Sequence, residues 1–229
     1  MEYPEDPWDG CYEGKEFLHE EERREAIDCA EWISRARTLK YELTEAQKYA
    51  GTALYRIRAL KSFRDIKEGD FGGWVESPQA LSQSGDCWIS KDAIVVDRAT
   101  IKEDARISDN AIISGDATIS GQAKVGGEAR VSDCAIVQGH ARVGQLAIIQ
   151  GHAIVEEGGY VGGTAVISGK VIVRGSTHIS GNARVQGHTV LSEGIIIKDT
   201  LPSIEENPKA LTKDVVLTSL SSKNSKGVE

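Results

Sequence analysis

The sequence has few of the residues that build aromatic cores, disulfide frameworks or membrane spans. Aromatic residues make up 6% of its 229 residues, and it contains 5 Pro and 1 Met. The four cysteines, Cys11, Cys29, Cys87 and Cys134, lack the C-x-x-C spacing of a zinc knuckle or a dithiol redox site. The sequence also lacks an apolar run of about 18 residues that could cross a bilayer and a start that resembles a signal peptide. We therefore expect a cytoplasmic protein with free thiols, no membrane contact and no metal site.

Charge is unevenly distributed over the first quarter of the chain. Residues 1–30 contain eleven Asp and Glu against three Lys and Arg, a local charge of −8 that equals the formal net charge of the whole protein. Residues 31–64 reverse this pattern, with eight basic against three acidic residues. Loosely helical spacing of apolar residues within 12–50, with Thr44-x-x-Gln47 as a capping box, predicts two helices in this region.

A six-residue repeat dominates the rest of the sequence. From Asp92 to Asp199 the chain divides into eighteen consecutive hexads without an insertion. The second place is Ala in thirteen of them, and the fourth is Val or Ile in seventeen. These two places lie two residues apart, so on a strand both point inward. The sixth place is Gly in ten hexads and Asp, Glu or Gln in the other eight, which indicates a corner with positive φ.

An aliphatic residue followed four places later by a small one, as in Ile101 and Ala105 or Ile107 and Ala111, resembles the hexapeptide signature of the left-handed parallel β-helix superfamily. The resemblance implies a mainly-β fold in which three hexads form one triangular coil. The eighteen hexads then form about six coils, and residues eighteen apart stack in one column. A charged residue at Ile119 or Val143 should break such a core.

The segments before the repeat, "YRIRALKSF", "GDFGGWVES" and "LSQSGDCWIS", resemble small hexapeptide-repeat proteins of phages and prophages, a type from which no activity is implied. Alternation of apolar and polar residues there predicts a β-rich cap on the first coil. The expected divisions are an acidic then basic helical region at 1–50, the cap at 51–91, the β-helix at 92–199 and a polar tail at 200–229.

The third place of each hexad points outward, and sorting it by eighteen yields three rows. We call them the aliphatic row, the basic row and the mixed row. The aliphatic row is Thr100, Thr118, Ile136, Ile154, Ile172 and Val190; the basic row is Arg106, Lys124, Arg142, Tyr160, His178 and Ile196; the mixed row is Ile94, Ile112, Arg130, Ile148, Val166 and Arg184.

Two of these rows are candidate contact surfaces. The aliphatic row, at Ile136, Ile154, Ile172 and Val190, is expected to pack against a second copy of the chain or the N-terminal helices. The alternative is that β-propensity alone selects these residues. The basic row, at Arg106, Lys124, Arg142, Tyr160 and His178, can bind an acidic protein or a nucleic-acid backbone. Its alternatives are an ordinary solvated face and docking of the acidic first thirty residues of the chain.

The histidines of the repeat lie at corners. His152 and His188 share a corner column with Lys170, and two strand spacings, about 10 Å, separate the two imidazoles. The superfamily resemblance implies that acyltransferases build sites at such an edge, between subunits of a trimer, with a histidine as general base and an acyl-CoA as donor. The sequence shows neither the extruded loop of such enzymes nor an acidic residue near His152 to orient its ring. Corner histidines without chemistry are the alternative.

The sequence therefore favours a non-catalytic β-helix protein of phage or prophage type. It would form homo-oligomers and bind a macromolecular partner, such as a host protein that it inhibits, through flat faces and the acidic N-terminal segment, without a cofactor. A trimeric acyltransferase that uses acetyl-CoA or another acyl-CoA is one alternative. A rigid structural spacer is the other.

Overall fold

The computed structural model describes residues 39–192, 194, 196–197 and 216–217. Residues 12–38 of the region in which two helices are expected (12–50), the acidic segment and most of the tail lie outside these residues. The strands belong to one compact unit that begins at Lys40. No helix among the described residues is long and apolar enough to cross a membrane.

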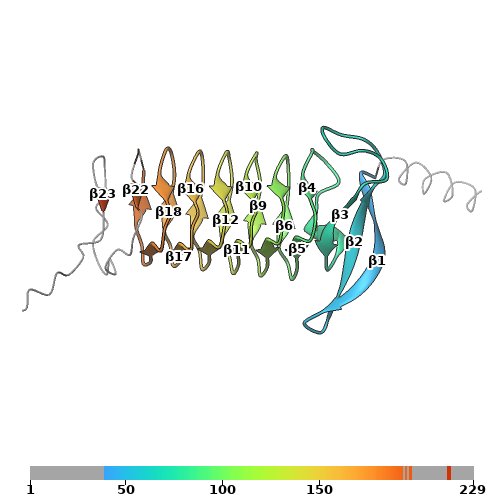
Figure 1. The fold of residues 1–229 in the computed structure, drawn as a ribbon, viewed down its shortest axis with the longest axis horizontal. Coiled ribbons are helices and arrows are strands. Elements are labelled where there is room, and N and C mark those ends of the chain that lie inside the picture. Colours follow the sequence, from blue (N-terminus) through green and yellow to red (C-terminus); the bar gives the residue numbers. More distant parts are fainter. Residues whose placement is uncertain (1–38, 193, 195, 198–215, 218–229) are drawn as a thin grey trace, which may run out of the picture. The chain divides into compact units, whose positions relative to one another are not determined.

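Three sheets form a β-helix (Figure 1). From β4 onward their strands have two residues each and pair in parallel, and each turn of the chain adds one strand to each sheet. The sheet that carries the mixed row begins with β1 (Tyr41–Tyr49), β2 (Thr52–Ala59) and β3 (Phe71–Val75), then continues through β5 (Ile94–Val95), β8 (Ile112–Ile113), β11 (Arg130–Val131), β14 (Ile148–Ile149), β17 (Val166–Ile167) and β20 (Arg184–Val185). The sheet of the aliphatic row contains β6 (Thr100–Ile101), β9 (Thr118–Ile119), β12 (Ile136–Val137), β15 (Ile154–Val155), β18 (Ile172–Val173) and β21 (Val190–Leu191). The sheet of the basic row contains β4 (Trp88–Ile89), β7 (Arg106–Ile107), β10 (Lys124–Val125), β13 (Arg142–Val143), β16 (Tyr160–Val161), β19 (His178–Ile179), β22 (Ile196–Ile197) and β23 (Val216–Leu217).

The predicted inward places of the hexad form the core. Ala117 at a second place and Ile119 at a fourth place are both 0% exposed, and the same alternation recurs in every described coil. Strands eighteen residues apart pair in register, as in Thr118 with Ile136 and Ile119 with Val137. The mainly-β fold and the stacking of columns are thereby confirmed.

The sixth place of the hexad adopts the left-handed conformation, as its composition predicts. Asp97, Asp109 and Asp133 have φ values of 58°, 60° and 59°, although they are not glycines. Their carboxylates accept the backbone N–H of the corner glycine one coil further on, as in Gly151 N to Asp133 Oδ2 at 2.8 Å. An acidic corner residue therefore gains a hydrogen bond that offsets part of the cost of positive φ.

Gly163 provides a test of the corner, because a side chain there has no space. Its φ is +68°, and a Cβ built on it would lie 2.6 Å from the backbone nitrogen of Gly181 in the next coil. Gly163→Ala is expected to lower the free energy of unfolding by about 2 kcal/mol or more, from left-handed strain plus the clash. Gly144→Ala is the matched control, since a Cβ at Gly144 meets nothing within 4 Å. Equal denaturation midpoints for the two variants would contradict this account of the corner.

The β-helix has about seven coils, one more than the hexads predict. The additional coil precedes Asp92: β3 pairs with β5, Leu81 bridges to Ile101, and β4 pairs with β7. The inward-pointing residues Leu81 and Ile89 are eight positions apart in the sequence, whereas their partners Ile101 and Ile107 are six positions apart. Two additional residues at this corner break the period, so the unbroken six-residue repeat starts one coil later than the β-helix does.

The expected helix around Thr44 and Gln47 is wrong, since residues 41–49 form strand β1. It pairs antiparallel with β2 through a two-residue turn at Ala50 and Gly51, both at positive φ. The Thr44 hydroxyl donates to the carbonyl of Arg56 across the hairpin (3.0 Å) and does not cap a helix. Strand pairing here overrides a helical pattern in the local sequence. The expected β-rich character of residues 51–91 is confirmed by β2, β3 and β4.

Lys40 joins the hairpin to the long corner of the first coil. Its side chain is buried, and Nζ donates to the carbonyls of Gly85 and Cys87 at 3.2 and 3.0 Å and contacts Cys87 Sγ at 3.2 Å. The backbone N–H of Lys40 donates to Oε1 of Gln83 (2.7 Å). The two-residue insertion thus forms a cage of carbonyls, and the ammonium group fills it.

Two ionisable side chains at this junction, Tyr41 and Lys40, are expected to make the free energy of unfolding depend on pH. Burial raises the pKa of Tyr41 above its ordinary value of 10.0, and its hydroxyl lies 2.8 and 2.7 Å from the carbonyls of Pro78 and Leu81. Above about pH 10 the folded protein keeps this proton while the unfolded chain loses it, so stability should fall. Burial lowers the pKa of Lys40 from 10.5, so below that pH the unfolded chain binds more protons and stability should rise with pH.

Denaturation midpoints measured from pH 8 to 12 should therefore pass through a maximum near pH 10. Tyr41→Phe, which has no phenol proton, should lose stability less steeply on the alkaline side. If the profile of the variant has the same slope as that of the wild type above pH 10, the assignment to Tyr41 is wrong.

Candidate functional site

The basic row forms one continuous column, but its members differ in accessibility. Lys124 pairs in register with Arg106 on one side and Arg142 on the other. Arg106 is engaged by the cap, because its guanidinium donates to Asp65 at 2.7 Å and its side chain is only 17% exposed. Lys124 and Arg142 are exposed, and within the described residues neither forms an ion pair. The two free cations therefore lie on adjacent strands.

Aromatic rings continue the column beyond the two cations. Tyr160 pairs in register with Arg142 and with His178. The rings of Tyr160 and His178 stack, with centroids 4.3 Å apart and an interplanar angle of 28°. The column thus passes from two exposed cations to a stacked aromatic pair over three strand spacings, roughly 14 Å.

Four consecutive hexads of this column, those of Lys124, Arg142, Tyr160 and His178, contain no acidic residue. The hexads that begin at Gln122, His140, Gly158 and Ser176 read QAKVGG, HARVGQ, GGYVGG and STHISG. Ten of the eighteen hexads contain no Asp or Glu, and these four follow one another on consecutive strands of one sheet. The electrostatic potential over this part of the sheet is therefore more positive than the net charge of −8 suggests.

The aliphatic row is in register along its sheet. Ile136 pairs with Ile154, Ile154 with Ile172, and Ile172 with Val190. All four side chains are half-buried by their neighbours in the column. Packing against a second copy or against the N-terminal region stays a prediction.

The histidine column occupies the corner that precedes the aliphatic row. His152, Lys170 and His188 are exposed at three successive coils. Within the part of the chain that the structure describes, their side chains make no hydrogen bond or ion pair. Further along the same corner, Arg98 forms a two-pronged ion pair with Asp116 (2.6 and 2.8 Å), which leaves that carboxylate engaged. Among the described residues, no carboxylate is therefore placed to orient either histidine as a base.

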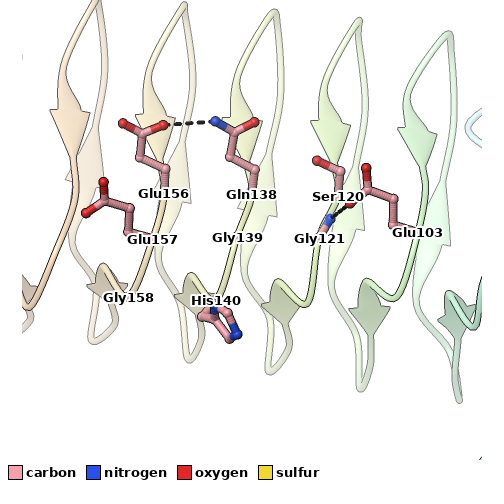
Figure 2. A pocket seen from close by; sticks show the side chains of 9 residues that line it. All are labelled: Glu103, Ser120, Gly121, Gln138, Gly139, His140, Glu156, Glu157 and Gly158. Carbon is pink, nitrogen blue, oxygen red and sulfur yellow. Dashed lines mark hydrogen bonds between the residues drawn. The ribbon is translucent and has the colours of Figure 1, made fainter.

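A shallow depression of about 720 Å³ lies on the corner between the aliphatic and basic rows (Figure 2). Glycines form its floor, and carboxylates border it at both ends. Glu103 accepts the N–H of Gly121 (2.6 Å), and Glu156 accepts from the side-chain amide of Gln138 (2.9 Å). Its lining residues are Glu103, Ser120, Gly121, Gln138, Gly139, His140, Glu156, Glu157 and Gly158. The described residues contain no cluster of three or more ligands suited to a metal ion.

Sequence reasoning named the members of the basic row but missed two features of it. The ion pair of Arg106 depends on Asp65, which lies 41 residues away in the cap. The acid-free hexads become visible only when whole hexads, and not single places, are sorted by sheet. The acidic depression was also missed, although a corner column with Glu at both ends and Gly between them is readable from the period.

Comparisons with known proteins match parts of the repeat. A family model described as the YdcK β-solenoid repeat matches residues 105–121 and 179–193. A relative in Escherichia coli (strain K12), named "Uncharacterized acetyltransferase YdcK", is 33% identical over 72 residues, which is 27% of this chain. The chain covers 22% of the length of that relative. The residues matched by the family model therefore lie within the β-helix.

Proposed function

Since the chain is a member of the hexapeptide-repeat β-helix superfamily, we propose that it is a non-catalytic binding protein that meets an acidic macromolecular partner with the basic row. The observation that carries the proposal is the exposed and unpaired state of Lys124 and Arg142 on acid-free strands. Self-association through the aliphatic row would multiply this surface. A phage or prophage origin, and inhibition of a host protein, belong to the same proposal and rest on the sequence resemblance.

Rigidity supports a binding role. Each two-residue strand is held by backbone hydrogen bonds to both neighbouring coils, such as Lys124 N to Ala141 O at 2.9 Å and Arg106 N to Ala123 O at 2.9 Å. The cations of the basic row are thus spaced by the backbone at about 4.8 Å, without a loop that must order on binding. A preorganised surface loses little conformational entropy when a partner is bound.

The proposal is tested by capture from lysate of the native cell with the complete chain as bait. Lys124→Glu with Arg142→Glu should abolish capture of the partner, because both free cations are reversed while the inward places are untouched. Arg130→Glu with Arg184→Glu is the matched control, with exposed arginines at the same hexad place on the mixed row and the same change in net charge. Unchanged capture by the basic-row variant would exclude this surface.

An acyltransferase remains the second candidate, because the relative in E. coli is named an acetyltransferase. A CoA-type donor would bind between copies of the chain, and His152 or His188 would take a proton from an acceptor hydroxyl or amine. Acetyl-CoA binding by calorimetry that disappears in His152→Ala or His188→Ala would favour this function. Absence of binding in a confirmed trimer would count against it. Stable self-association without any ligand would favour a rigid spacer instead.

A further inference from the structure

Resting on the proposed function, we propose that the acidic partner is a single-stranded nucleic acid, bound across strands β10, β13, β16 and β19 of the basic row. The backbone phosphates would contact Lys124 and Arg142, and the bases would contact the Tyr160–His178 pair. The inference comes from the charge, the relief and the aromatic geometry of these four strands.

Lys124 and Arg142 place two positive charges next to each other. Lys124 and Arg142 lie on adjacent strands in register, about 4.8 Å apart at the backbone. Like charges on directly neighbouring strands repel, and no acidic residue of the four hexads compensates them. The other acids near this surface lie at its corners. Asp109 is bound to Lys91 and to the N–H of Gly127, Glu156 is bound to Gln138, and Glu128 and Glu157 are exposed. An external anion between the two cations would remove their repulsion.

The outer surface of the sheet beside the cations contains glycines where other strands have side chains. On three neighbouring strands of this sheet, the fifth places of the hexads are Gly126, Gly144 and Gly162. The Ser108 hydroxyl lies over Gly126, 2.7 Å from where a Cβ would be, and the Tyr160 hydroxyl lies over Gly162. Above Gly144 there is open space, with nothing within 4 Å of a Cβ. The surface therefore has a notch beside Arg142, with the Tyr160 hydroxyl on one side as a donor for a phosphate oxygen and the Ser108 hydroxyl on the other, which donates to Asp109 (3.2 Å).

The aromatic pair decides between classes of polyanion. Tyr160 and His178 stack on the surface of the sheet, one coil beyond Arg142. Unpaired bases stack on aromatic side chains that lie on a β-sheet surface, whereas a duplex hides the faces of its bases. An acidic peptide would use the cations but has no need of an aromatic pair. The combination of adjacent cations, a bare backbone notch and stacked rings matches a single strand best.

The length of the surface sets the expected binding behaviour. From Lys124 to His178 the row spans about 14 Å, enough for a few nucleotides. With two phosphate contacts, the logarithm of the association constant should fall with the logarithm of salt concentration with a slope of about −1.4. The site is therefore weak when single, and self-association would strengthen it.

Fluorescence anisotropy of a labelled twelve-residue oligothymidine, titrated with the full chain at low salt, tests the inference. Tyr160→Ala should weaken binding about tenfold or more through lost stacking, with an unchanged salt slope. Arg142→Glu should weaken binding and reduce the slope by about 0.7, because a phosphate contact is lost. Arg130→Glu, which makes the same change in charge on the mixed row, should bind as the wild type does. Labelled poly-glutamate and a duplex of the same length are the comparison probes.

The outcomes separate this inference from the function on which it rests. Preference for the single strand, with sensitivity to both Tyr160→Ala and Arg142→Glu, supports it. Equal binding of the duplex, or no effect of Tyr160→Ala, overturns it. Binding of poly-glutamate but not of the oligonucleotide, lost in Arg142→Glu, overturns the nucleic-acid inference and leaves an acidic protein partner in place. Binding of none of the probes, together with unchanged lysate capture by the basic-row variant, overturns both.

Discussion

Replacing Ile119 by Asp is expected to prevent the β-helix from folding, with a loss of about 5 kcal/mol or more in the free energy of unfolding. Ile119 is 0% exposed and pairs in register with Ile101 and Val137 in the adjacent coils. A carboxylate in this column would be buried among aliphatic side chains without a donor. Because each coil contacts only its neighbours, the disruption should be greatest in the coils next to the substitution.

Far-UV circular dichroism during guanidinium denaturation measures this effect. Thr118→Asp is the control, since Thr118 lies on the same strand but points outward and is half-buried. It should change the free energy of unfolding by less than about 1 kcal/mol. If the two variants unfold at similar denaturant concentrations, the assignment of inward and outward places is wrong.

Replacing Lys40 by Ala should detach the N-terminal hairpin from the first coil. The carbonyls of Gly85 and Cys87 would lose their donor in a buried cage, at a cost of about 2 to 4 kcal/mol. Hydrogen exchange should then accelerate in β1 and β2 more than in the coils after Asp92. Lys48→Ala, at the exposed distal part of β1, is the matched control and should leave exchange of both regions unchanged. Uniform acceleration along the chain, or none, would show that Lys40 does not anchor the hairpin.

The β-helix was predictable because its information is local and repeated. In most hexads, Ala at the second place and Val or Ile at the fourth place mark the side chains that point inward. The number of hexads per coil, which decides which strands pair in register, came from the superfamily resemblance. The first coil was not predictable in the same way, because the two additional residues between Leu81 and Ile89 interrupt the period. The cage that compensates this interruption depends on Lys40, whose partners lie more than 40 residues away.

The hairpin at 41–59 shows where local patterns fail. Thr44 and Gln47 fit a helix start, but the Ala50–Gly51 turn and the pairing of Leu43 with Ile57 favour a strand. The candidate site shows an intermediate case. The column of Lys124, Arg142 and Tyr160 follows from the period, whereas the engagement of Arg106 by Asp65 depends on the fold of the cap.

The most direct measurement of the central claim, that one face of the β-helix binds polyanions, is elution from a heparin column in a salt gradient. The double variant Lys124→Glu with Arg142→Glu is compared with Arg130→Glu with Arg184→Glu, so that net charge is equal and only the face differs. We predict that the basic-row variant elutes at clearly lower salt, while the mixed-row variant elutes close to the wild type. Elution of both variants at the same salt concentration would contradict the account, because retention would then follow net charge alone.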